Sequence, residues 1–124
     1  LIGINDTWRR YDSGDPTPAE AYETHYRTIL ESTRDALHAQ IIILEPFSLP
    51  VPEDRATWRV DLDPKIAVAR KLAREFDATF VPLDGLFASA ATRREMGFWL
   101  PDGVHPSPAG HALIAQAWLR AIGA

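Results

Sequence analysis

Four consecutive aliphatic residues, IIIL at Ile41–Leu44, decide the fold class of this sequence. An unbroken apolar run of this length is typical of a strand covered on both faces, as in parallel sheets. The stretches on either side carry apolar residues at helical spacing. A second short apolar run, TFVPL at Thr79–Leu83, follows the downstream helical stretch. This alternation predicts an α/β protein with a parallel sheet and helices on both faces.

The helix before Ile41 is indicated by its start signals and its apolar face. Thr17 suits an N-cap, Pro18 suits the first helical position, and Glu20 completes a capping box. The apolar residues at helical spacing are Tyr22, Tyr26, Ile29, Leu30 and Leu37.

Three further helices are expected downstream. Asp63 and Pro64 predict the start of the first, a short one is expected over 86–94, and Ser107 with Pro108 predicts the start of the last. The inner face of the first should contain Ile66, Ala69, Leu72, Ala73 and Phe76.

The sequence LIGI at Leu1–Ile4 is apolar and ends at the turn signal Asn5-Asp6, which predicts the end of a buried strand. An exposed apolar strand edge invites aggregation, so such a strand needs neighbours on both sides. We therefore expect further strands upstream of Leu1, or strands supplied by another chain.

The composition excludes several classes of protein. The chain has 124 residues, 46% hydrophobic and 24% charged, which fits a single globular domain. Its net charge of −4 gives no reason to expect nucleic-acid binding. The absence of cysteine excludes disulfides and thiolate zinc sites, and no apolar run is long enough for a membrane span. Because the sequence does not begin with Met, cytoplasmic and secreted locations both stay open.

Asp102 and His105 stand three residues apart in the loop sequence LPDGVHPSPAGH, Leu100–His111. A carboxylate that accepts a hydrogen bond from one imidazole nitrogen fixes the tautomer and leaves the other nitrogen free as a base. Pro106 disfavours helix at His105, so the ring should project from a stiff loop. Taken alone, the pattern favours an Asp-Gly turn with a surface histidine, because D-x-x-H is common. Metal ligation that adds His111 is a weaker alternative, since imidazole–carboxylate pairing explains these residues better.

Asn5 is a second candidate, because a side-chain amide can donate a hydrogen bond to a developing oxyanion. Its alternative role is that of a turn residue at the end of a strand. In open α/β sheets, ligands bind at the carboxyl ends of the strands. Asn5 and the loop of Asp102 and His105 are expected to meet at that edge.

The stretches GINDTWRRYDSG, at 3–14, and DGVHPSPAGHALIAQAWL, at 102–119, together resemble two sequence blocks of the SGNH, or GDSL-type, hydrolases. One block of that family is G-x-N-D and another is D-x-x-H. The resemblance covers nearly the whole chain. It implies a three-layer α/β/α flavodoxin-like sandwich with a parallel sheet, whose N-terminal strands are missing from this chain.

The resemblance also implies roles for four residues. His105 would be the general base and then the general acid, Asp102 would orient it, and Asn5 would donate to the oxyanion. Gly3 matches the glycine of its block and would let the backbone approach the substrate closely. The expected function is ester hydrolysis through an acyl-enzyme, on a small acyl ester or an acetylated carbohydrate, with no metal or organic cofactor.

The sequence departs from the family at the nucleophile. The family's serine lies in a G-D-S block that this chain lacks, and no serine present here fits that motif. We therefore interpret residues 1–124 as a single partial domain, the C-terminal part of a hydrolase whose serine lies in an upstream segment. The alternative is a catalytically inactive fragment or an α/β binding module. A nucleotide-binding flavodoxin-like protein is disfavoured, because no glycine-rich phosphate loop is present.

Aromatic and basic residues near the predicted site have two interpretations each. Phe47, Trp58 and Trp99 either line a substrate pocket or pack their loops onto the body of the domain. Arg9 and Arg10 either bind an anionic group of the substrate or form surface ion pairs.

Overall fold

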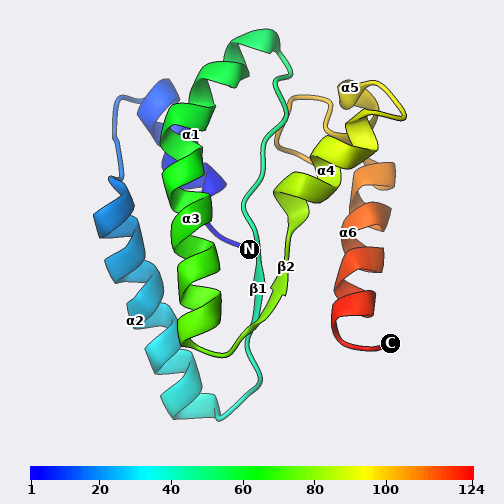
Figure 1. Cartoon of the computed structure of the whole chain (residues 1–124). Helices are drawn as coiled ribbons and strands as arrows, with labels where there is room; N and C mark the ends of the chain where they lie inside the picture. Colours follow the sequence, from blue (N-terminus) through cyan, green and yellow to red (C-terminus); the bar gives the residue numbers. More distant parts are fainter.

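A computed structural model of the chain describes all 124 residues, and it consists mainly of helices with two short strands at its centre (Figure 1). In chain order they are α1 (Ile4–Asp12), α2 (Ala19–Leu37), β1 (Ile42–Leu44), the 3-10 helix η1 (Glu53–Trp58), α3 (Arg59–Glu75), β2 (Thr79–Val81), α4 (Leu83–Ala91), α5 (Met96–Trp99) and α6 (Pro108–Ala121).

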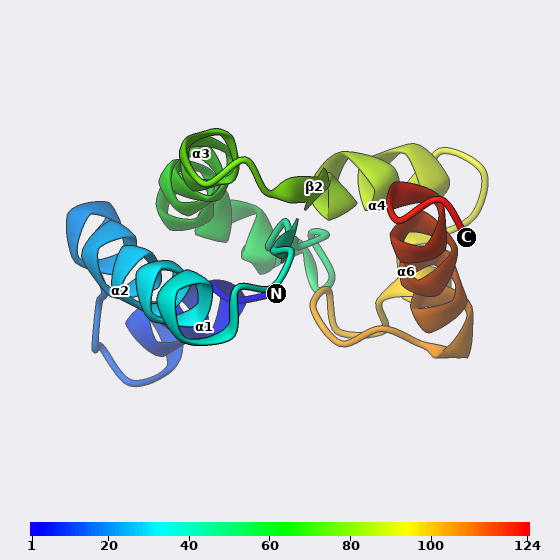
Figure 2. The ribbon, with the colours of Figure 1, turned by 90° about the horizontal axis from the view of Figure 1, so that it is seen from below.

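Strands β1 and β2 form a parallel pair in which Ile43 stands opposite Phe80. Side chains that alternate along these strands pack into two separate hydrophobic cores. Ile43 packs among residues of α2 and α3, whereas Val81 packs among residues of α4 and the loop after β1. The view from below shows α2 and α3 on one side of the strands and α4 and α6 on the other (Figure 2). The predicted α/β class and parallel pairing are confirmed for these two strands, and the complete three-layer sandwich stays a prediction.

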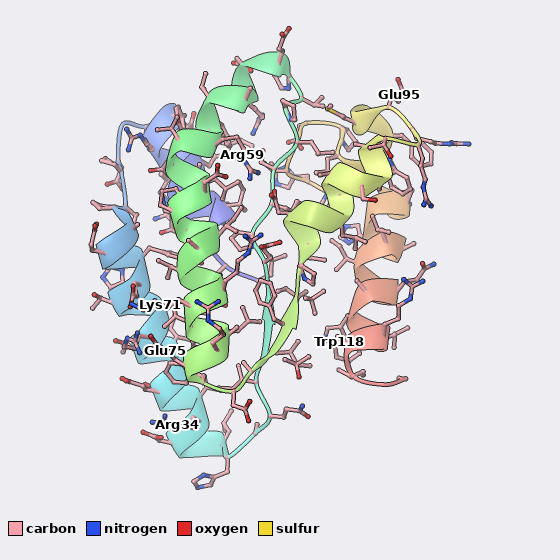
Figure 3. All side chains as sticks on the ribbon, in the orientation of Figure 1. Arg34, Arg59, Lys71, Glu75, Glu95 and Trp118 are labelled. Atoms are coloured by element: carbon pink, nitrogen blue, oxygen red, sulfur yellow. The ribbon has the colours of Figure 1, made fainter.

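The first core lies between α2, α3 and β1 and contains two tyrosines of α2. Tyr22 and Tyr26 are almost fully buried, as predicted from their spacing, whereas Ile29 and Leu37 of the same predicted face are exposed. On the outside, Lys71 and Glu75 of α3 lie along α2 and form ion pairs with Glu23 at 2.7 Å and Arg27 at 2.6 Å (Figure 3).

The predicted strand at Leu1–Ile4 is wrong. Gly3 has a φ of +130°, outside the extended region, and α1 begins at the next residue. Leu1 and Ile2 are exposed, and no ladder hydrogen bonds form there. The positive φ of the glycine thus directs Asn5 onto a helix instead of a turn.

Two predicted helix starts also differ from the structure. α2 begins after Pro18, so Thr17 does not cap it and no side chain bonds its first turn. α3 begins at Arg59 and includes Pro64, because η1 leads into it without a break. Pro64 has no backbone N–H, so the carbonyl of Val60, an exposed residue, lacks its usual helical donor.

The last helix begins as predicted. The Ser107 side chain accepts a hydrogen bond from Gly110 N–H at 3.1 Å and donates one to the carbonyl of Phe98 at 2.7 Å. These bonds fix the end of the loop that carries Asp102 and His105. The helix expected over 86–94 is instead α4, which starts three residues earlier, followed by α5. None of the helices combines the length and apolarity that crossing a bilayer requires.

Candidate active site

The predicted pairing of Asp102 with His105 is present. The Asp102 Oδ2 atom lies 2.7 Å from His105 Nδ1, and Oδ1 accepts hydrogen bonds from the backbone N–H groups of His105 at 2.8 Å and Val104 at 3.2 Å. Three donors thus hold the carboxylate in one orientation. With Nδ1 engaged, Nε2 has no partner within the chain, and the His105 side chain is 75% exposed. This is the arrangement of a base with its working nitrogen open to a ligand.

These contacts also set the charge of the acid. Burial raises the pKa of the Asp102 carboxyl, but the hydrogen bonds from the His105 ring and the two backbone N–H groups outweigh burial and lower the pKa from 3.8 to about 2. Asp102 is therefore ionised at neutral pH and accepts a proton-bearing Nδ1.

Gly103 explains how the loop is seated. Its φ is +85°, and a Cβ atom there would lie 2.4 Å from the carbonyl oxygen of Leu49 and 2.5 Å from that of Val51. Leu49 N–H donates to the Gly103 carbonyl at 2.9 Å. The loop after β1 and the loop of Asp102 are therefore in direct backbone contact, which only glycine permits.

Asn5 reaches the same site from α1. Asn5, Trp8 and Arg9 share one face of this helix, because residues three and four positions apart are neighbours. Together with His105 they line a pocket of about 280 Å³. The structure thus brings Asn5 and His105 together from opposite ends of the chain.

Gly3 directly precedes this helix and does not line the pocket. A Cβ atom on Gly3 would lie 3.0 Å from the Tyr22 hydroxyl and 3.2 Å from Pro46, and the Tyr22 hydroxyl donates to the carbonyl of Ile2 at 3.0 Å. The close approach at Gly3 is therefore to protein atoms, and it lets α1 start beside the loop that follows β1.

A stack of aromatic rings and one guanidinium supports the pocket. The Arg55 guanidinium carbon lies 4.5 Å from the centre of the Trp8 ring and 4.3 Å from that of Trp58. Trp8 contacts His105 with 5.6 Å between ring centres, and Tyr11 stacks on Trp58 at 5.4 Å. Cation–π contacts of this kind hold a side chain at a defined angle. The stack joins α1 to η1 and fixes the indole that forms the pocket wall.

The three aromatic residues predicted to line the substrate pocket do not line the pocket of His105. Phe47 is buried in the second core, 4.5 Å between ring centres from Phe87, and does not line the pocket of His105. Trp99 lines a different pocket, between α5 and α6, together with Phe98. Trp58 is buried and acts on the site through Arg55 and Trp8.

Polar contacts at the carboxyl ends of the strands hold the scaffold. Glu45, the residue after β1, is fully buried, pairs with Arg70 at 2.6 Å and accepts the N–H of Asp84 at 3.0 Å. Arg59 donates two hydrogen bonds to Asp84, at 2.7 and 2.9 Å (Figure 3). These carboxylates are engaged by protein groups and stabilise the loop–helix junctions.

Comparison with known proteins identifies the family. The profile of the GDSL-like lipase/acylhydrolase family matches residues 1–113. The chain belongs to this family. An acetylxylan esterase from Geobacillus stearothermophilus is 32% identical over 99% of the chain, and the chain spans 57% of that protein. The resemblance expected from G-x-N-D and D-x-x-H is thereby confirmed.

Solved structures of similar proteins have backbones that closely match that of this chain. A crystal structure described as a putative GDSL-like lipase from Parabacteroides merdae matches with a TM-score of 0.93 and 36% identity, over 99% of this chain and 58% of that one. A catalytic mutant of the Geobacillus acetylxylan esterase, with a histidine replaced by alanine, matches with a TM-score of 0.87 and 31% identity, over 99% of this chain and 57% of that one. The chain therefore spans somewhat more than half of these relatives.

Sequence reasoning named Arg9 as a candidate for binding an anionic group but missed Trp8 and Arg55 as neighbours of the site. Asn5 was assigned to a turn, and only on a helix do Trp8 and Arg9 follow it on the same face. Arg55 gave no local signal, because its partners come from a distant helix. The helical spacing of Trp8 from Asn5 was the one available indication.

Proposed function

We propose that the protein containing this chain is a serine ester hydrolase that acts through an acyl-enzyme. The observation that carries the proposal is the Asp102–His105 pair with its free Nε2, which lines one pocket with Asn5. Family membership and a relative named as an acetylxylan esterase support it.

The nucleophile in this proposal is a serine outside residues 1–124. None of the five serines of the chain hydrogen-bonds His105, and Ser13, Ser48 and Ser107 instead donate to backbone carbonyls. A catalytic mutant of the Geobacillus relative carries alanine in place of a serine, which supports a serine nucleophile.

The proposed reaction has two halves. The serine hydroxyl attacks the ester carbonyl while His105 Nε2 takes its proton, and the carbonyl electron pair moves onto oxygen. The amide of Asn5 donates to that oxyanion. Collapse of the intermediate expels the alcohol, which receives the proton from His105. Water then attacks the acyl-enzyme with His105 again as base, and this step releases the acid and the serine.

Asp102 acts through His105 in both halves. Its carboxylate binds Nδ1–H and stabilises the imidazolium that forms when Nε2 accepts a proton. Its depressed pKa, about 2, keeps it ionised at neutral pH.

The substrate that we propose is a small acetyl or short-acyl ester, with acetylated carbohydrate as the leading class. The support is a relative named as an acetyl-xylooligosaccharide esterase, 31% identical to this chain. The exposed pocket beside Trp8 is compatible with an alcohol much larger than the acyl group.

A serine-reactive fluorophosphonate on the full-length protein tests the proposal. We expect covalent labelling of one serine, release of acetate from acetylated xylo-oligosaccharides, and loss of both in the His105→Ala variant. His111→Ala is the matched control, since this exposed histidine lies on α6 outside the pocket. Absence of labelling and turnover in the native protein would favour a binding module instead.

A further inference from the structure

The candidate pocket contains a cation with no partner. Arg9 lines the pocket with Asn5, Trp8 and His105, and its guanidinium makes no hydrogen bond, ion pair or aromatic contact with the rest of the chain. The four lining residues include no carboxylate. The pocket therefore presents a guanidinium that pairs with no carboxylate of the chain.

The neighbouring arginine shows the contrast. Arg10 pairs with Asp61 at 3.2 Å and so ties α1 to α3. Most other basic residues near α3 are also engaged, such as Arg59 with Asp84. Two adjacent arginines on one helix thus have different roles, because one faces the protein and the other faces the pocket.

The wall beside Arg9 is rigid and aromatic. The Trp8 indole contacts both the Arg55 guanidinium and the His105 ring. A planar or pyranose ring that packs against this indole would place a substituent near Arg9, since Trp8 and Arg9 line the same pocket. Guanidinium is well suited to bind a carboxylate through two parallel hydrogen bonds.

The chemistry of the proposed reaction indicates which half of the ester lies here. His105 must deliver its proton to the leaving oxygen, so the alcohol half lies next to the imidazole. Trp8 contacts that imidazole and Arg9 follows Trp8. Groups on the alcohol are therefore the ones that reach Arg9.

We infer that Arg9 is a specificity-determining residue that binds a carboxylate carried by the alcohol half of the ester, as in an acetylated sugar acid or an acetoxyarene carboxylate. This inference rests on the proposed esterase function. It adds to it a charge preference that neither the family nor the relatives' names contain.

Paired synthetic esters test the inference on the full-length protein. The probes are 3-acetoxybenzoate and the neutral 3-acetoxybenzamide, which share the acetyl group and differ at the ring substituent. We expect kcat/KM to favour the anion, and Arg9→Gln to reduce that preference roughly three- to tenfold, mainly through KM. Arg9→Lys should retain part of the preference, and added salt should weaken it because the pair is exposed.

A matched control separates a local contact from net charge. Arg74→Gln removes the same charge from an exposed arginine near the C-terminal end of α3 and should leave both rates unchanged. An equal charge preference in native protein and Arg9→Gln would overturn the inference while leaving the esterase function intact. A preference that appears only with monophenyl succinate, whose charge lies on the acyl half, would also overturn it. Hydrolysis of none of the probes by a protein that the fluorophosphonate labels would overturn this inference alone, whereas absence of labelling and of acetate release from xylo-oligosaccharides would overturn the esterase proposal as well.

Discussion

Two acid–base pairs of similar spacing lie in opposite surroundings in this protein. Asp102 and His105 are three residues apart on an exposed loop, whereas Asp61 and Lys65 are four residues apart within α3 and almost fully buried. Lys65 Nζ donates to the Asp61 side chain, and Asp61 also receives Arg10 of α1. The buried pair joins two helices.

The difference lies in what each pair leaves free. Hydrogen bonds outweigh burial and lower the pKa of both Asp61 and Asp102, so both acids are ionised. In the buried pair the cation faces only protein. In the exposed pair the second imidazole nitrogen remains open. An acid–base pair whose groups contact only protein therefore indicates a structural role. A pair that leaves one nitrogen free beside a pocket indicates a catalytic role. The two pairs should respond oppositely to substitution.

The largest expected effect is on turnover in His105→Ala. Removing the base should lower kcat by about 10⁴-fold or more, as loss of a triad member does. The midpoint of urea unfolding should hardly change, because the ring is mostly exposed. Steady-state ester hydrolysis and urea unfolding of the full-length protein measure the two. A loss of stability with normal turnover would instead give the Asp102–His105 pair a structural role.

Lys65→Met should give the opposite result. It leaves the Asp61 carboxylate buried without its main partner, at a cost of about 3–5 kcal/mol in the free energy of unfolding. Adding Asp61→Leu should recover much of that loss, and the recovery distinguishes an unpaired charge from poor packing. Urea unfolding of the single and double variants checks this. Equal stability of native protein and Lys65→Met would remove the structural role of the pair.

Asn5→Ala tests the proposed role of Asn5 as a donor to the oxyanion. Loss of one oxyanion donor should lower kcat by about 10²–10³-fold with little change in KM. Asp6→Asn on the same turn is the matched control, because Asp6 does not line the pocket. The measurement is a kcat and KM determination on one acetyl ester. A change confined to KM would place Asn5 in substrate binding instead.

The smallest expected effect is the contribution of Asp102 to the pH dependence of the unfolding free energy at low pH. The Asp102 carboxyl has a pKa of about 2 in the folded chain and 3.8 as a free reference, so its contribution is complete above about pH 4 and is lost as the pH falls towards 2. In Asp102→Asn the change in unfolding free energy between pH 4 and 2 should be smaller than in the native protein. Partial exposure makes this difference modest. Unfolding curves at several pH values measure this difference. The same pH dependence of the unfolding free energy in both proteins would show that the hydrogen bonds of Asp102 do not stabilise the fold.

Local features were predicted well from the sequence. The two strands follow from unbroken apolar runs, and the start of α6 at Ser107 follows from one serine and one proline. The Asp102–His105 pair also involves neighbours in sequence, and the loop geometry needed for it is encoded by Gly103 and Pro106. Each of these depends on a few consecutive residues, so no long-range information was required.

Features that depend on packing were predicted poorly. Leu1–Ile4 has the composition of a strand, but a positive φ at Gly3 and the helix after it decide otherwise. Pro64 was expected at the start of a helix, but η1 precedes it and extends the helix upstream. Phe47 was a candidate for the pocket and lies in the core instead. Gly3 packs against Tyr22 and Pro46 and Phe47 against Phe87, which are distant in sequence, whereas the start of α3 depends on the 3-10 helix directly before it.

The sequence by itself therefore determined the family, the parallel strand pair and the acid–base pair, because these are encoded in short motifs with local geometry. The meeting of Asn5 with His105 was also expected from the sequence, but only the tertiary structure decided that Trp8 and Arg9 share their pocket. Asn5, Trp8 and Arg9 meet His105 because α1 packs on α3 through Arg10 and Asp61 and on η1 through Arg55. Contacts between segments so far apart in sequence arise from the packing of whole helices, which no local pattern specifies.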